Sequence, residues 1–289
     1  YISYDGMTEP LGQSQVIPYL IHLSEKGHNF VLLSAEKRAS YYKYKNKIAG
    51  ILKNNNINWV PVFYTKNPPV LSTIWDIIKL YHQTKKLHKK HKFNIIHCRS
   101  YISALIGLNL KKKYGVKFIF DMRGFFPDER VEANIWELNN FIFRRVYRYF
   151  KKKEKQFFKK SDFIISLTNA GKKAIQDEIM INEYDFNTQI EIIPCCTDMK
   201  HFSKDNISDK LVKKFKKELN IKENDFILCY LGSIGTWYLL EEMLQFFVCL
   251  LAKKENARSG GQAKFLFITK NSKAQILQKA EKYEIPKNK

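Results

Sequence analysis

The sequence predicts an α/β fold with two domains, each built on a doubly wound parallel sheet. Strand-like and helix-like segments alternate along most of the chain, which is typical of parallel sheets covered by helices. A short apolar strand runs into a glycine turn and a helix at Tyr1–Gln15, and again at Phe226–Tyr238. Between them, a polar, lysine-rich stretch near residues 200–224 interrupts the pattern. We therefore expect domains at residues 1–197 and 198–289.

The first domain begins with a strand at Tyr1–Tyr4. A helix at Ser14–Lys26 follows, because its apolar residues recur at helical spacing and Gly27 comes directly after it. The further elements are, in order, a strand at Asn29–Ser34, a helix to Asn54, a strand at Trp59–Tyr64, a helix at Thr73–His91, a strand at Asn94–Cys98, a helix at Ser100–Lys113, a strand at Lys117–Asp121, a long helix at Glu137–Lys160, a strand at Phe163–Leu167, a helix at Asn169–Met180 and a strand at Ile190–Ile193.

The second domain has fewer elements. A strand at Phe226–Leu231, a helix from about Leu239, a strand at Phe265–Thr269 and one more helix account for it. A doubly wound domain carries about five or six strands, so we expect the second domain to be truncated. The chain also opens on Tyr1 inside a strand-like segment, and we expect residues to be missing at both ends.

The net charge of +22 points to an anionic partner. Lysine supplies 42 of the 50 basic residues, whereas proteins that read nucleic-acid sequence rely on arginine forks. An anionic membrane surface attracts each nearby basic residue by about 1 kcal/mol. The five cysteines lack metal-type spacing, and no apolar run reaches the roughly 20 residues that span a bilayer. These features predict a cytoplasmic protein, peripheral on the inner face of the plasma membrane, with no metal site.

The glycine turns are candidate phosphate sites. Glycine lets the backbone approach a ligand closely, and the free N–H groups at a helix start attract anions. An ordinary turn without a ligand is the alternative for the first of them. The candidate donor- and phosphate-binding residues are Gly12, Gln13, Ser14, Gly232, Ser233, Gly235 and Thr236.

Charged residues follow two predicted strands at the edge where open α/β sheets bind ligands. Asp121 and Arg123 end one strand, and Arg123 can hold a phosphate or an acceptor oxygen with two N–H groups. Asp128 and Glu129 follow as candidates for a general base, and local Asp121–Arg130 or Glu129–Arg123 ion pairs are the alternative.

Two further residues are candidates for a cleft. Arg99 closes the preceding strand beside His97, and we interpret that histidine as a hydrogen-bonded structural residue. Asp198 follows the last strand of the first domain, where an aspartate can cap a turn; the family resemblance described below implies instead that it borders the donor.

A basic stretch at Lys79–Lys92 has few large apolar residues and a dense positive charge. We expect it to face lipid, through a surface made of Lys85, Lys86, Lys89 and Lys90. The aromatic and basic segment Phe141–Lys160 fits a membrane-surface helix equally well, but we interpret it as a core-packing helix with a solvated back.

Six segments resemble family 4 glycosyltransferases of the GT-B fold, which has two Rossmann-like domains facing a cleft. They are Ser3–Gln15, Leu23–His28, Phe120–Arg130, Ser161–Thr168, Ile192–Asp198 and Gly232–Tyr238. The resemblance implies transfer of a sugar from a UDP- or GDP-linked donor to a polysaccharide or lipid-linked glycan, with retention of anomeric configuration. It also implies no cofactor and no obligatory metal, and the sequence contains no Asp-x-Asp motif.

The sequence departs from the family pattern in its second domain. Thr236, Trp237 and Tyr238 stand where many members carry an arginine and a lysine. The family's paired glutamates eight residues apart are not found in this domain either, so the resemblance leaves the activity of this stretch of chain open. A sugar-nucleotide epimerase of the same fold, and a non-catalytic basic module that binds anionic lipid or nucleic acid, are the alternatives.

Overall fold

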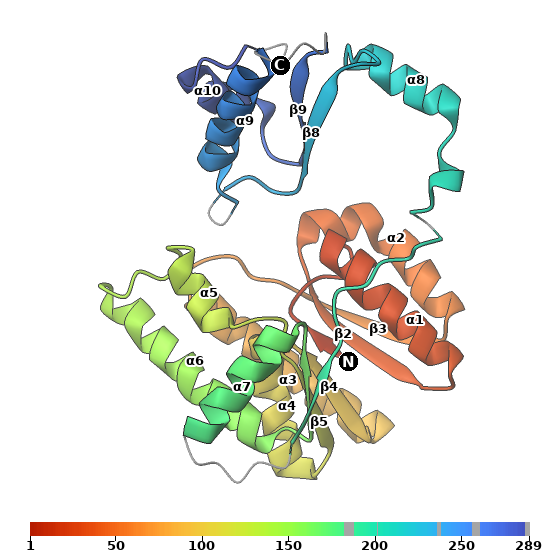
Figure 1. The fold of residues 1–289 in the computed structure, drawn as a ribbon. Coiled ribbons are helices and arrows are strands. Elements are labelled where there is room, and N and C mark those ends of the chain that lie inside the picture. The colour runs from red at the N-terminus through yellow and green to blue at the C-terminus, as the bar shows by residue number, and fades with distance from the viewer. Residues whose placement is uncertain (182–187, 201, 236–237, 256–260, 287–289) are drawn as a thin grey trace. The chain divides into compact units, whose positions relative to one another are not determined.

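The computed structural model describes residues 1–181, 188–200, 202–235, 238–255 and 261–286. The chain divides into two compact units, Tyr1–Thr197 and Asp198–Lys289, each with its own sheet and apolar core (Figure 1). Within the described ranges, no helix combines the length and the apolar character needed to cross a bilayer.

In the described part of the first unit, seven strands form one parallel sheet in the order β3-β2-β1-β4-β5-β6-β7. The strands are short and largely apolar, as in sheets that helices cover on both faces. Their bounds are β1 Ile2–Ser3, β2 Phe30–Glu36, β3 Ile57–Phe63, β4 Ile95–Arg99, β5 Lys117–Asp121, β6 Phe163–Ser166 and β7 Gln189–Ile192.

Helices cover both faces of this sheet, because neighbouring strand residues point to opposite sides. Leu32 packs into a core with residues of α1 (Ile17–Glu25) and α2 (Arg38–Asn54). Leu33 packs into a second core with residues of the remaining helices. These are α3 Leu71–His91, α4 Ser100–Tyr114, α6 Phe141–Lys160 and α7 Asn169–Ile181, with the short α5 Phe126–Glu132 before α6 (Figure 1).

The strand order creates a switch point between β1 and β4. These strands pair side by side, with Ser3 opposite Arg99, but the helices that follow them, α1 and α4, contribute to the cores on opposite faces. In open α/β sheets, ligands bind in the crevice at the carboxyl ends of such strands. The fold therefore directs attention to the residues after β1, β4 and β5.

A π-helical turn, Gly12–Val16, precedes α1. A Cβ on Gly12 would lie 2.3 Å from the carbonyl oxygen of Gly6 and 2.6 Å from the Cα of Met7. The loop after β1 thus folds back directly onto the turn, which only glycine permits. The turn sets the position of Gln15, which lies inside it.

The second unit contains α8 Asp209–Glu218, β8 Phe226–Leu231, α9 Leu240–Glu255, β9 Ala263–Ile268 and α10 Lys273–Lys282, with a short 3-10 turn at Lys204–Asn206. β8 and β9 pair in parallel, with Phe226 opposite Ala263. Ile234, Leu240 and Leu244 form the centre of a small core against this sheet.

Candidate functional site

Two arginines meet on one glutamine at the carboxyl edge of the sheet. Arg99 is the last residue of β4, and its Nη2 donates to Oε1 of Gln15 at 2.9 Å. Arg123 lies two residues after β5, and its Nη2 donates to the same oxygen at 2.8 Å. The Gln15 amide therefore holds the two guanidinium groups side by side, although these residues are 84 and 108 positions away in the sequence.

Carboxylates balance part of this positive charge. Arg99 Nε lies 3.1 Å from Oδ2 of Asp5, and Asp121 lies within 3.9 Å of Arg99 and 3.7 Å of Arg123. The Arg99 side chain is 5% exposed, whereas that of Arg123 is 18% exposed. Arg123 is thus the more accessible of the two cations, and Arg99 is the more firmly fixed.

Two residues at these arginines have a left-handed backbone. Ser100, directly after Arg99, has a φ of 64°, and Arg123 itself has a φ of 61°. A side-chain-bearing residue in this left-handed region costs about 1–3 kcal/mol, and such residues occur most often at functional sites. The strain supports a functional role for the turns after β4 and β5.

His97 lies behind the arginines. Its ring packs on Tyr1 at 4.5 Å between centroids, and its Nε2 lies 3.5 Å from Oδ2 of Asp121. Burial lowers the pKa of His97, while the Asp121 carboxylate opposes that shift. Burial of Arg99 would lower its pKa too, but Tyr1, Asp121 and Asp5 raise it overall, so the guanidinium remains charged.

We expect His97 to make the protein less stable in acid. Its folded pKa lies below the unfolded value of about 6.5. Below that unfolded pKa the unfolded chain binds a proton that the folded chain resists. The free energy of unfolding therefore decreases as the pH is lowered, by up to about 1.4 kcal/mol per pH unit. Urea denaturation of the wild type and His97→Gln at neutral and acid pH measures this, with His22→Gln as the exposed control. Equal pH slopes for His97→Gln and wild type would contradict it.

Glu36 organises the loop before the π-turn. This side chain is fully buried at the end of β2 and accepts from the backbone N–H of Met7 at 2.6 Å and of Thr8 at 3.1 Å. The hydroxyls of Thr8 and Ser34 donate to it at 2.5 and 2.6 Å. One carboxylate thereby fixes the loop that carries Asp5 to Arg99.

Two polar side chains of the first glycine turn donate to backbone carbonyls of the loop just before it. Gln13 Nε2 donates to the carbonyl of Thr8 at 3.0 Å, and Ser14 Oγ donates to the carbonyl of Pro10 at 2.8 Å. Gly12 is buried and makes the backbone contact described above. The structure thus assigns these predicted phosphate-binding residues local contacts, and it brings their neighbour Gln15 to the arginines.

The two carboxylates of α5 have different surroundings. Asp128 accepts from Tyr147 at 2.8 Å and from Lys151 at 3.0 Å, both on α6. Glu129 lies against Gly124, where a Cβ would be 2.1 Å from its Oε1, and burial raises its pKa. Neither of the predicted local ion pairs occurs among the described contacts: the acidic partner of Arg123 is Asp121, and Arg130 lies over the Phe126 ring.

The second glycine turn lies in the second unit, directly after β8. Gly232 and Gly235 have φ values of 157° and 133°. The Ser233 carbonyl accepts from Tyr230 at 2.6 Å, and the Ile234 N–H donates to Asn271 Oδ1 at 3.1 Å. Among the described residues outside its own chain neighbours, none lies within 4 Å of a Cβ placed on Gly235. The predicted residue Thr236 lies outside the described residues.

The remaining predicted residues are Asp198, in the second unit, and four lysines of α3. Asp198 Oδ1 accepts from the Lys200 N–H at 2.9 Å in a local turn. The predicted lipid-facing lysines belong to the last part of α3, where Lys85 is half-buried and the other three are exposed: Lys86, Lys89 and Lys90.

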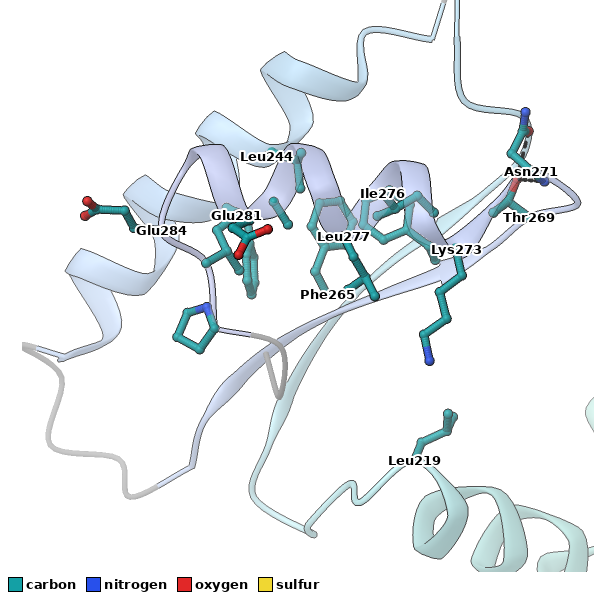
Figure 2. A pocket seen from close by; sticks show the side chains of 15 residues that line it. Leu219, Leu244, Phe265, Thr269, Asn271, Lys273, Ile276, Leu277, Glu281 and Glu284 are labelled. Carbon is teal, nitrogen blue, oxygen red and sulfur yellow. Dashed lines mark hydrogen bonds between the residues drawn. The ribbon is translucent and has the colours of Figure 1, made fainter.

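A hollow of about 610 Å³ lies in the second unit. Figure 2 shows Leu244, Phe265, Ile276 and Leu277 gathered at its wall, with Asn271 at the end of the strand. The lining is mainly apolar, and it contains none of the residues predicted as site residues. Because a diphosphate requires N–H donors and cations, this hollow is a poor match for one.

The candidate site residues predicted from the sequence do not include Gln15, Asp5 or Glu36, although Asp5 and Gln15 belong to the polar run around the first glycine turn. Glu36 carried a usable signal, since a carboxylate ends the apolar run Phe30–Glu36 at the ligand-binding edge. The contacts of Gln15 and Asp5 cross 84 or more positions of sequence, and no local pattern encodes them.

Comparison with solved structures supports the fold. The N-terminal domain of a trehalose-6-phosphate phosphatase from Candida albicans aligns with a TM-score of 0.63 at 11% identity, over 100% of this chain and 71% of that chain. A trehalose-6-phosphate synthase from Burkholderia multivorans gives a TM-score of 0.61 at 12% identity, over 98% and 67%. A glycosyltransferase from Rickettsia africae gives 0.52 at 13%, over 96% and 70%. At such low identity the likeness shows the fold alone, and it confirms the predicted GT-B class.

Sequence comparison supplies the family. No curated protein sequence matches the chain. The model of Glycosyltransferase Family 4 matches residues 14–201, a range that includes Gln15, Arg99 and Arg123 and most of the first unit. This match confirms the family that the motifs predicted. The chain therefore belongs to glycosyltransferase family 4.

Proposed function

We propose that the protein is a retaining hexosyltransferase. It moves a sugar from a UDP- or GDP-linked donor to a polysaccharide or lipid-linked glycan at the cytoplasmic face of the membrane. Family membership supports the reaction class. The single observation that supports the location of the chemistry is the pair of guanidinium groups on Gln15 at the switch point. Such a pair suits an anionic or oxygen-rich group.

The arginines would act on charge that develops during transfer. The bond between the anomeric carbon and the departing diphosphate breaks, and negative charge grows on the diphosphate. Preorganised N–H groups stabilise such charge most effectively when they are already fixed before the reaction. Arg99 is fixed by Asp5 and Gln15, and Arg123 presents its more exposed guanidinium beside it. These fixed cations support a mechanism without a metal.

A front-face retaining reaction needs no protein nucleophile, but the acceptor hydroxyl must lose a proton. Of the two carboxylates of α5, we assign this role to Glu129. Asp128 accepts hydrogen bonds from Lys151 and Tyr147, which gives it a structural role. Glu129 is half-buried with a raised pKa, which suits a proton acceptor.

Nucleotide binding tests this proposal. Calorimetric titration of the protein with UDP, GDP and their hexose conjugates should give a dissociation constant between about 1 μM and 1 mM for one nucleotide series. AMP serves as the control ligand. Absence of binding by every uridine and guanosine nucleotide would refute the proposal. Conversion of the donor sugar to its epimer without any acceptor would show that the protein is an epimerase and not a transferase.

A further inference from the structure

Helix α3 buries polar residues over its first turns. One line of side chains at four-residue spacing faces the protein: Ser72, Asp76, Leu80, Thr84 and His88 are buried. Asp76 accepts from the Tyr4 hydroxyl at 3.0 Å and from the Thr65 N–H at 2.9 Å, and Lys79 pairs with it at 2.7 Å. These contacts fix the orientation of the helix.

The opposite face of these turns is apolar and exposed. Leu71 is 64% exposed, Ile74 48%, Trp75 56% and Ile78 42%. They follow one another at spacings of three, one and three residues, which places them on one side of the helix. A helix that hides an aspartate and a serine while exposing four large apolar residues is inverted relative to an ordinary surface helix. Contiguous exposed apolar residues mark interaction surfaces.

The same face becomes basic further along the helix. Lys86 and Lys89 follow Trp75 and Ile78 by about three helical turns each, which places them on the same face of the helix. Lys90 lies next to Lys89. All three lysines are exposed. The outer face of α3 is therefore apolar at one end and cationic at the other.

We propose that this face of α3 docks on an anionic lipid bilayer. Leu71, Ile74, Trp75 and Ile78 insert among the head groups, and Lys86, Lys89 and Lys90 bind lipid phosphates. Apolar side chains, tryptophan and lysines on one helix face are the composition of interfacial helices. The net charge of +22 adds long-range attraction to an anionic surface. Duplex nucleic acid would leave the four apolar residues in water.

The apolar turns at the start of α3 are connected to the arginine cluster through Tyr4 and Asp5. Tyr4, which binds Asp76 of α3, is followed by Asp5, which binds Arg99. α3 begins after the carboxyl end of β3, at the edge where the cluster lies. Lipid binding by α3 requires no sugar nucleotide, so it can fail separately from the proposed transfer.

Vesicle flotation tests the docking. The protein should float with vesicles of phosphatidylcholine and phosphatidylglycerol, and much less with phosphatidylcholine alone. Removing three charges in Lys86→Gln/Lys89→Gln/Lys90→Gln should weaken binding roughly 100-fold, at about fivefold per lysine. Removing apolar surface in Ile74→Ser/Trp75→Ser should weaken it roughly 30-fold. Lys43→Gln/Lys47→Gln/Lys53→Gln on α2, which covers the other face of the sheet, is the charge-matched control and should bind like the wild type.

Tryptophan fluorescence supplies a second readout. Brominated lipids should quench the wild type, and Trp75→Phe should lose most of this quenching while it keeps its vesicle binding. If the α2 control lost as much vesicle binding as the α3 lysine variant, overall charge would explain the effect and the proposal would be overturned. Unchanged binding by both α3 variants would overturn it as well, and so would preference for duplex DNA over anionic vesicles.

Discussion

Replacing Arg123 with alanine should lower kcat/KM for sugar transfer by about 100- to 1000-fold, the cost of removing one preorganised donor to developing charge. The variant removes the more exposed of the two guanidinium groups on Gln15. Alanine retains a Cβ, so the left-handed backbone at residue 123 has the same strain as before. Steady-state kinetics of nucleotide release measure the effect.

Arg123→Lys and Arg38→Ala complete this experiment. Lysine retains the charge but loses the fork that reaches Gln15 and Asp121 together, so we expect a partial loss. Arg38, the first residue of α2, lies over the Phe63 ring, and its removal should leave kcat/KM near the wild-type value. If Arg123→Ala and Arg38→Ala have equal kinetics, Arg123 does not belong to the site.

Replacing Glu36 with alanine should lower the free energy of unfolding by about 3–5 kcal/mol. The buried carboxylate receives two backbone N–H groups and two hydroxyls, and all four donors would lose their acceptor. Glu36→Gln should cost about 2 kcal/mol, because its amide nitrogen replaces an oxygen that accepts from one backbone N–H and one hydroxyl. Urea denaturation at neutral pH measures both.

Glu25→Ala is the matched control, since this exposed carboxylate of α1 pairs only with the exposed His22 among the described residues. Its loss should change stability by less than about 0.5 kcal/mol. Comparable midpoints for Glu36→Ala and Glu25→Ala would show that the loop before the π-turn does not depend on Glu36.

The sequence predicted the strands of the first unit well, since most of them are short apolar runs with a polar end. Lys117–Asp121 was predicted with the bounds that β5 has. Helix starts were less accurate. The helix expected from Ser14 begins as a π-turn at Gly12 because the loop at Gly6 packs directly on it. The helix expected from Glu137 starts at Phe141, where Asn140 accepts from the Ile142 N–H.

Two helices were not expected. α5 is only seven residues long and carries four charged side chains, so it resembles a loop in the sequence. α8 lies inside the lysine-rich stretch that we interpreted as polar. Its apolar residues Leu211 and Phe215 are four positions apart and exposed, and a composition average conceals such spacing.

Part of the site was accessible from sequence because strand ends mark the ligand-binding edge. This reasoning found Arg99, Asp121 and Arg123, which the structure brings together. It did not find Gln15, because its role depends on which way the π-turn points the side chain. It also placed Asp128 beside Glu129 in the same role, whereas Asp128 is held by Tyr147 and Lys151 of α6.

The contacts of Tyr4 and Asp5 join two parts of the first unit through a single peptide bond. Tyr4 holds the start of α3, and Asp5 holds Arg99. If α3 docks on a leaflet, the guanidinium groups are kept at a constant height above it. An acceptor anchored in that leaflet would then reach them by lateral diffusion, at a local concentration set by its surface density. Turnover would follow the mole fraction of acceptor in the vesicles, and diluting the assay at constant mole fraction would change it little.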